Sequence, residues 1–175
     1  AITLADAGAR VLLVGADLRR PKMAKYMGIE DAVGLTDVLI GHVEFQHAVQ
    51  RWGRSDLYLL PSGSIPPNPS ELLGSSRMDE LIKELDQRFD VVLYDSPPLL
   101  PVTDAAVLAK LVGGAVVIVA AGTTHVTQLD SALASLETVG AHVSGLVLSM
   151  LPSRGPDAYG YGRYGYNFEE PARAN

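Results

Sequence analysis

Short, continuous runs of apolar residues recur along this chain, and most are rich in Val, Leu and Ile. A strand buried on both faces produces such a run, whereas a strand with one solvated face alternates apolar and polar residues. The runs therefore predict an α/β fold with a mostly parallel sheet and helices on both faces. The predicted strands cover residues 11–14, 57–60, 91–94, 115–121 and 144–150.

Several of the stretches between these runs have the periodicity of amphipathic helices. The clearest is 75–89, where apolar side chains recur every three or four residues and charged side chains lie opposite. Such a stripe indicates a helix that packs one face against a sheet. We expect further helices over residues 1–9, 34–39, 103–111 and 127–139.

The same pattern predicts finer features of these segments. Thr36 is the expected N-cap of the helix over 34–39, because a hydroxyl can accept a hydrogen bond from a free backbone N–H. Leu129, Leu133 and Leu136 form the expected buried stripe of the last helix. The prolines of 65–70 predict a loop.

The apolar pattern stops after Pro152, where tyrosines stand among glycines. A segment without large aliphatic residues cannot build a core, so we predict a folded part over 1–152 and a flexible, disordered tail over 153–175. Phosphorylation of four tyrosines would add about six to eight negative charges to this tail. Composition equally allows an aromatic, glycine-rich tail that stacks or self-associates. The four residues are Tyr159, Tyr161, Tyr164 and Tyr166.

Composition excludes several classes of protein. The 175 residues contain no cysteine, so disulfides and thiolate metal sites are absent. The formal net charge of -6 gives no general affinity for nucleic acid, and we expect no nucleic-acid partner. The longest apolar run, over 111–122, is too short to span a bilayer. Because the sequence starts at Ala1 instead of Met, we interpret it as a piece of a longer protein.

Two aspartates follow predicted strands directly. Asp95 ends the run over 91–94, before two prolines, and Asp17 follows the run over 11–14. Ligands of open α/β sheets bind outside the carboxyl ends of the strands, so two such acids could share a hydrated Mg²⁺. The alternatives are that Asp95 caps a turn and that Asp17 forms a surface pair with a following arginine, which would be worth little.

The remaining polar residues give weaker indications of a catalytic or binding role. Asp104 is expected to be a first-turn acid that the helix dipole favours. The four histidines are scattered, and we assign them no metal or catalytic role. A nucleotide site needs a phosphate loop such as G-x-x-x-x-G-K-[ST], and the sequence contains none. Either this loop lies upstream of Ala1 or the protein does not bind ATP.

Taken together, five stretches resemble the cytoplasmic domain of the bacterial tyrosine kinases of capsule and exopolysaccharide synthesis. The resemblance covers nearly the whole chain, from Ala1 to about Tyr166. A DSPP-type strand end also occurs in the wider group of partition ATPases, whereas PPNPSELL combined with a tyrosine tail is specific. The stretches are VLLVGADLRRP, GLTDVLIG, LLPSGSIPPNPSELLGSSRMDELI, FDVVLYDSPPLLPVTDA and the terminal tyrosines.

The resemblance implies a P-loop NTPase-like fold that uses ATP and Mg²⁺. Asp95 would be the Walker B acid and Asp17 an acid of the second Walker-type signature, both near the metal and both catalytic. Ser149 stands where related ATPases often have an asparagine beside the adenine ring, so it would belong to the nucleotide site. The four tail tyrosines would be phosphoacceptors for a neighbouring subunit in a ring.

The expected function is therefore an ATP-dependent protein-tyrosine autokinase that regulates synthesis or export of a surface polysaccharide. The resemblance implies a homo-oligomer at the cytoplasmic face of the cell membrane, with a transmembrane chain-length (co-polymerase) protein or domain as partner. Two alternatives stay open. One is a non-catalytic pseudokinase module of the same system, and the other is a partition-type ATPase.

Two departures from the family pattern bear on activity. Gly15 stands where the second signature usually has its first acid. The phosphate loop and its strand are missing, so we expect these 175 residues by themselves not to bind ATP. Loss of that central strand should also leave unpaired backbone on its neighbours.

Overall fold

A computed structural model describes residues 1–151 of the chain. The predicted boundary at 152 and the four tail tyrosines therefore lie outside the described residues. In chain order the elements are α1 (Ile2–Asp6), β1 (Val11–Gly15), α2 (Met23–Met27), α3 (Leu35–Leu39), α4 (Phe45–Ala48), β2 (Gln50–Trp52), β3 (Leu57–Leu60), α5 (Pro69–Leu73), α6 (Ser76–Arg88), β4 (Val91–Asp95), α7 (Asp104–Leu111), β5 (Ala115–Ala120), α8 (Val126–Thr138) and β6 (Val143–Ser149).

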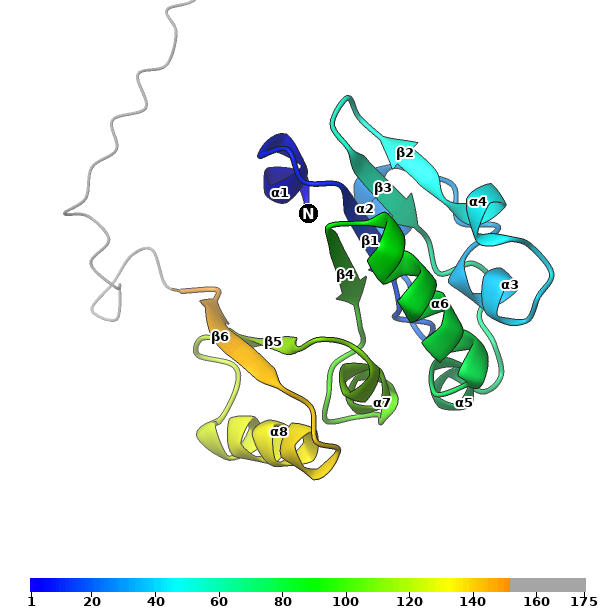
Figure 1. The fold of residues 1–175 in the computed structure, drawn as a ribbon. Helices are drawn as coiled ribbons and strands as arrows, with labels where there is room; N and C mark the ends of the chain where they lie inside the picture. Colours follow the sequence, from blue (N-terminus) through cyan, green and yellow to red (C-terminus); the bar gives the residue numbers. More distant parts are fainter. Residues whose placement is uncertain (152–175) are drawn as a thin grey trace, which may run out of the picture.

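Four strands form one sheet in the order β2-β3-β1-β4 (Figure 1). β1 lies between two parallel neighbours, so that Val11 pairs with Leu57 of β3 and with Val91 of β4. The short strand β2 pairs antiparallel with β3 at the far edge. The sheet is therefore mostly parallel, as the continuous apolar runs predicted.

Both faces of this sheet are covered by helices. Alternate β1 residues, including Leu12 and Val14, pack with residues of α3, α5, α6 and α7 in the larger core. Val11 lies on the other face, in a smaller core with Ala5 of α1 and Met27 of α2. Because β1 is covered on both sides, Val11, Leu12 and Val14 have no exposed surface. This double cover explains why the run has no polar alternation.

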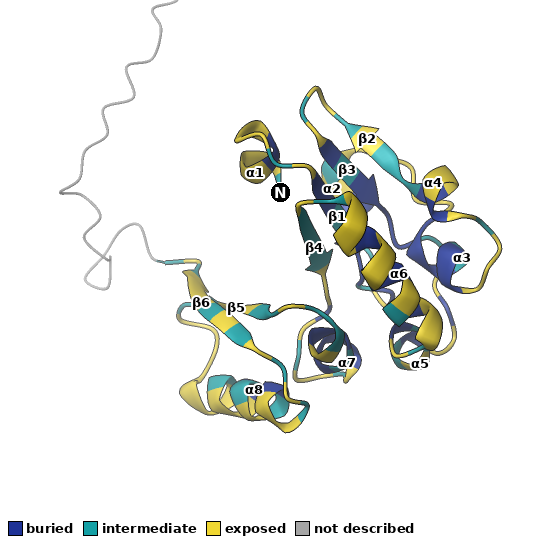
Figure 2. Ribbon diagram, viewed as in Figure 1, coloured by how far each residue is buried: buried dark blue, intermediate teal, exposed yellow. Residues whose placement is uncertain are grey.

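The last two strands form a separate sheet. β5 and β6 pair in parallel with each other, and neither is hydrogen-bonded to β4 (Figure 1). Much of this unit is exposed or only half-buried, in contrast to β1 and β3 (Figure 2). Val116 and Ile118 of β5 are 60% and 70% exposed. Among the described residues, β4, β5 and β6 each pair with one strand only.

The five predicted strands and the main amphipathic helix are confirmed. α6 starts after Ser75, whose Oγ accepts a hydrogen bond from the Met78 N–H at 3.3 Å. The helices α2 and α4 and the strand β2 were not predicted, because segments of three to five residues are too short to show a period. No helix among residues 1–151 has the length and apolar character needed to cross a membrane.

Three finer predictions were wrong. Gly34, not Thr36, is the N-cap of α3, and the Asp37 carboxylate accepts a hydrogen bond from its N–H at 2.9 Å. The loop over 65–70 ends early, because Pro69 is the first residue of α5 and its ring suits a helix start. In α8 only Leu136 of the predicted stripe is buried, whereas Leu129 and Leu133 are half-buried.

Candidate functional site

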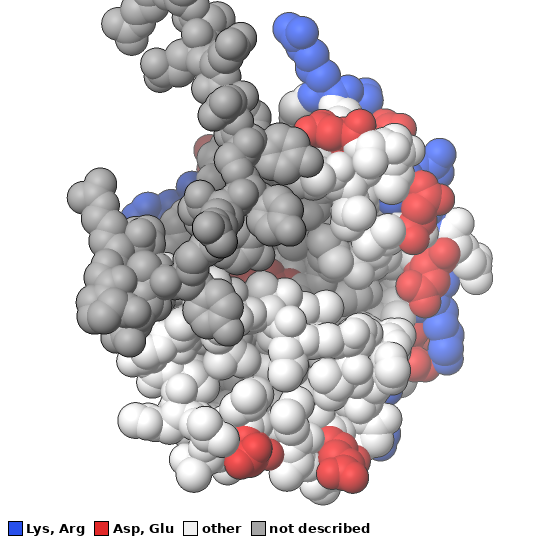
Figure 3. Space-filling view, turned by 90° about the vertical axis from the view of Figure 1, so that its left-hand side faces the viewer, with Lys and Arg blue, Asp and Glu red and all other residues white. Residues whose placement is uncertain are grey.

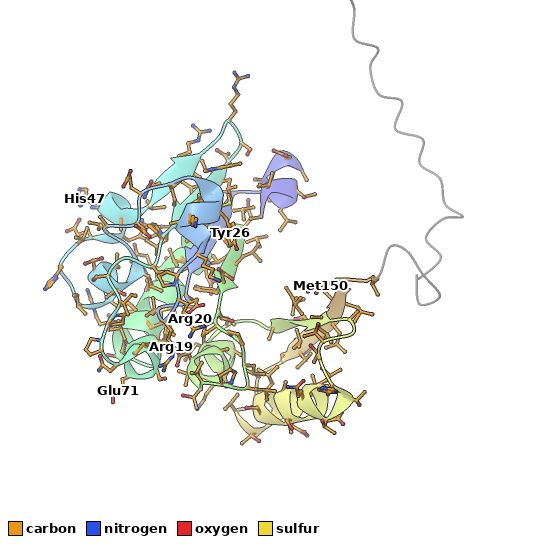
Figure 4. The ribbon with its side chains drawn as sticks, turned by 180° about the vertical axis from the view of Figure 1, so that it is seen from behind. Arg19, Arg20, Tyr26, His47, Glu71 and Met150 are labelled. Atoms are coloured by element: carbon orange, nitrogen blue, oxygen red, sulfur yellow. The ribbon has the colours of Figure 1, made fainter. Side chains whose placement is uncertain are left out.

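Pairing of β1 with β4 brings Asp17 and Asp95 to the same edge of the sheet. Gly15 is the register partner of Asp95, and the next residue, Ala16, donates its N–H to the Asp95 carbonyl at 2.8 Å. The loop that carries Asp17 therefore leaves β1 directly beside the end of β4. Figure 4 shows Arg19 and Arg20 on this loop, near α7. The strand-end rule thus placed both acids correctly.

The carboxylate of Asp17 is oriented by its own loop. Its Oδ1 accepts hydrogen bonds from the backbone N–H groups of Arg19 at 3.1 Å and Arg20 at 3.0 Å. This arrangement replaces the side-chain pair between Asp17 and an arginine that the sequence allowed as an alternative. Within residues 1–151, Oδ2 of Asp17 accepts no hydrogen bond, so one oxygen remains available to a ligand.

The electrostatics of Asp95 indicate that the two acids interact. Partial burial raises the pKa of the Asp95 carboxyl, and the negative charge of Asp17 raises it further. Each carboxylate disfavours the charged form of the other, and a cation bound between them would offset this repulsion. No cluster of three or more acidic or histidine ligands exists among the described residues. Two acids suffice for Mg²⁺, which keeps several waters, so this donor set fits that ion.

A side chain at Gly15, where the family pattern has an acid, would crowd its neighbours. A Cβ added here would lie 2.8 Å from Oγ of Ser62, 3.1 Å from its backbone nitrogen and 3.2 Å from Met23. Ser62 is itself held in place, because its Oγ donates a hydrogen bond to the Gly15 carbonyl at 2.8 Å. The glycine is therefore a packing requirement of this β1–β3 junction, and no sequence signal pointed to its partner 47 residues away.

Ser149 lies in the other sheet, at the end of β6. Its Oγ donates to the Val119 carbonyl at 3.2 Å, and its carbonyl accepts the Ala121 N–H at 2.8 Å. These hydrogen bonds stay within the β5–β6 unit. The proposed role of Ser149 beside a nucleotide stays a prediction.

Two hollows flank the described core. One, of about 330 Å³, adjoins Asp95 and is lined otherwise by side chains of β1, α2 and β4, among them Leu13, Tyr26 and Leu93. The other, of about 350 Å³, lies between α3, α4 and α6, away from the two acids. Figure 3 shows the side of the molecule on which β6 and α8 lie, and its lower half has few charged side chains. The hollow beside Asp95 is therefore the one of these two that adjoins a candidate acid.

Comparison with known proteins identifies the family. No protein-family model matches the sequence. The tyrosine-protein kinase YwqD of Bacillus subtilis is 37% identical over 161 residues, which are 92% of this chain and 68% of the relative. The kinase domain of Escherichia coli tyrosine kinase ETK superposes with a TM-score of 0.84 at 32% identity, over 91% of this chain and 63% of that structure. Longer kinases match too, and the chain spans 23% of one of them.

The fold has a wider relationship as well. The cell division ATPase MinD of Pyrococcus furiosus matches 84% of this chain and 62% of that structure, with a TM-score of 0.69 and 27% identity. The open α/β sheet with two strand-end acids therefore belongs to the P-loop NTPase class. Within this class, the chain belongs to the family of bacterial tyrosine-protein kinases. The family and fold class inferred from the sequence are confirmed.

Proposed function

We propose that the full protein is an ATP-dependent protein-tyrosine autokinase. Family membership supports this activity, and the observation that carries it in this chain is the convergence of Asp17 and Asp95 at the ends of two paired strands. Phosphoryl transfer requires positioning and charge neutralisation more than covalent chemistry by the protein. A pair of acids that can hold a metal at a sheet edge suits this requirement.

In this proposal Asp95 and the unbonded oxygen of Asp17 hold Mg²⁺, directly or through water. When bound, the ion would neutralise charge on the phosphoryl oxygens. The residues of the chain provide orientation. The Asp17 carboxylate is held by two backbone N–H groups, and β4 places Asp95 through its pairing with β1. Ser149 would lie on the adenine side of the nucleotide.

The phosphate loop is proposed to lie outside this sequence, on a strand that inserts between β4 and β5. Both strands have an open edge with which an inserted strand could pair, and Val116 and Ile118 of β5 are exposed on one face of their sheet. The relatives are longer than this chain, which leaves room for such a strand. The 175 residues by themselves would then lack the groups that hold ATP phosphates.

The remaining parts of the proposal rest on the family resemblance. Tyr159, Tyr161, Tyr164 and Tyr166 would accept phosphate from a neighbouring subunit of a homo-oligomer. The protein would act in capsule or exopolysaccharide synthesis at the cytoplasmic face of the membrane. Its partner would be a transmembrane chain-length protein or domain.

A non-catalytic pseudokinase is the second candidate, and Gly15 favours it. The position lacks the usual acid, and an added Cβ would lie 2.8 Å from Oγ of Ser62. The partition-type ATPase has weaker support, since MinD shares the fold at lower identity than the tyrosine kinases.

Phosphotyrosine mapping of the full protein tests the proposal. Wild type is incubated with ATP and Mg²⁺ beside Asp95→Asn and Asp17→Asn. We expect tail labelling in wild type and a fall of roughly 10²-fold in each variant, because a charge that stabilises the transition state is lost. Asp79→Asn, which changes an exposed carboxylate of α6, is the matched control and should label normally. Nucleotide binding without labelling would favour the pseudokinase.

A further inference from the structure

Three polar side chains from distant segments meet beside the candidate site, and we call them the Arg19 clamp. Arg19 donates from Nε to Oδ2 of Asp104 at 2.7 Å and from Nη2 to Oδ1 at 2.9 Å. Ser70 of α5 donates its Oγ to Asp104 Oδ1, and lies 3.3 Å from Arg19 Nη2. The clamp therefore joins the loop after β1 to the first residues of α5 and α7.

The geometry of the clamp is too specific for a simple helix-dipole acid. The Asp104 side chain has no exposed surface, whereas that of Arg19 is 39% exposed. A buried carboxylate is stable only if its oxygens are paired, and both oxygens of Asp104 are. The planar guanidinium matches a carboxylate with two parallel hydrogen bonds, which a lysine cannot do. Arg19 lowers the pKa of Asp104 and so keeps it charged.

The clamp acts on the residue whose backbone holds Asp17. The N–H of Arg19 donates to Asp17 Oδ1, and three residues earlier the N–H of Ala16 donates to the Asp95 carbonyl of β4. The loop is thus anchored at one end by the sheet and at the other by Asp104. If Asp104 releases Arg19, the Ala16 hydrogen bond and the buried Leu18 still anchor the loop, but Arg19, whose N–H holds Asp17, loses its side-chain anchor.

We propose that Asp104 is a positioning residue that acts through Arg19 to aim Asp17 at the metal beside Asp95. This inference rests on the proposed function, in which Asp17 serves the metal. It assigns Asp104 no contact with substrate or metal. It predicts that loss of the clamp raises the Mg²⁺ requirement of a protein that still folds.

The test uses the full protein with Asp104→Asn, Arg19→Lys and the control Asp79→Asn. Asp104→Asn keeps the volume and a bond to Ser70 but loses the charge. The first readout is amide hydrogen exchange over residues 16–20. We expect faster exchange at Arg19 and Arg20 in both clamp variants, with Ala16 unchanged. The second readout is the Mg²⁺ concentration that gives half-maximal autophosphorylation, which should rise roughly 3- to 10-fold as a positioning effect of about 1 kcal/mol.

The outcomes separate this inference from the proposed function. An unchanged Mg²⁺ requirement in an active Asp104→Asn protein overturns the inference. An equal loss of activity at all Mg²⁺ concentrations, together with uniformly faster amide exchange, also overturns it, because that result indicates a purely structural role. If wild type transfers no phosphate, the proposed function fails. The exchange data then decide the inference, and unchanged protection of Arg19 and Arg20 overturns it.

Discussion

The two sheets of this protein are built from similar residues and yet have opposite surroundings. β1 lies between β3 and β4, with helices on both faces, and Leu59 of neighbouring β3 has no exposed surface. β5 has one partner and one open edge, and Ile118 is 70% exposed. A continuous apolar run therefore indicates a strand that is suited to burial on both faces. Among the described residues, only the first sheet provides that burial. Four predictions test this difference, from the largest expected effect to the smallest.

Leucine truncation should separate the two sheets most clearly. Leu59→Ala in β3 should lower the free energy of unfolding by about 2–5 kcal/mol, because it leaves a cavity in a closed core. Leu148→Ala in β6 should cost less than about 1 kcal/mol, since that side chain is 51% exposed. Urea unfolding of the 175-residue chain measures both. Equal losses would show that the small sheet is covered in solution.

Glycine substitution tests the same contrast at backbone level. Gly15→Ala should destabilise by about 1–3 kcal/mol, because the new Cβ meets Ser62. Gly145→Ala in β6 is the matched control, since no atom lies within 4 Å of the added Cβ, and its effect should be small. Thermal unfolding of both variants and of Gly15→Ala with Ser62→Ala gives the coupling. If the double variant is no more stable to heat than Gly15→Ala, the proposed steric cause is wrong.

Acid should weaken the attachment of α7 to the first sheet. The pKa of Asp104 is lowered by the Arg19 hydrogen bonds, so its contribution is present above the ordinary aspartate pKa of about 3.9 and is lost as pH falls through the lowered value. Asp104→Asn should cost about 1–2 kcal/mol at pH 7 and progressively less in acid. Urea midpoints between pH 3 and 7 measure this difference. A cost that does not change with pH would exclude the charge as its origin.

The smallest effect is expected at the open edge of β4. Partial burial and the Asp17 charge raise the pKa of Asp95, so its folded form binds a proton more readily than its unfolded form. Protonated Asp95 therefore favours the folded state in acid, and this contribution to the free energy of unfolding is lost as pH rises. Asp95→Asn should stabilise the metal-free protein at pH 7 by less than about 1 kcal/mol. The gain should vanish near pH 3. Destabilisation at pH 7 would mean that a positive group faces Asp95.

Much of the fold was accessible to sequence analysis because its signals are local. The five apolar runs became five strands, and the stripe over 75–89 became α6. The meeting of Asp17 and Asp95 followed from one general rule, since parallel strands present their carboxyl ends at one edge. Thr36 shows where local reasoning failed, because its buried hydroxyl has no hydrogen-bond partner among residues 1–151, while Gly34 provides the cap of α3.

What the sequence by itself determined was the family, the class of fold, the strands and the two candidate acids. Only the tertiary structure decided that Arg19 pairs with Asp104 across 85 residues, that Gly15 packs on Ser62, and that β5 and β6 stand apart from β4. The physical reason is that periodicity and capping depend on neighbours within one or two turns of chain. Side-chain contacts at a strand end depend on strand order, and no local pattern encodes which strands lie side by side.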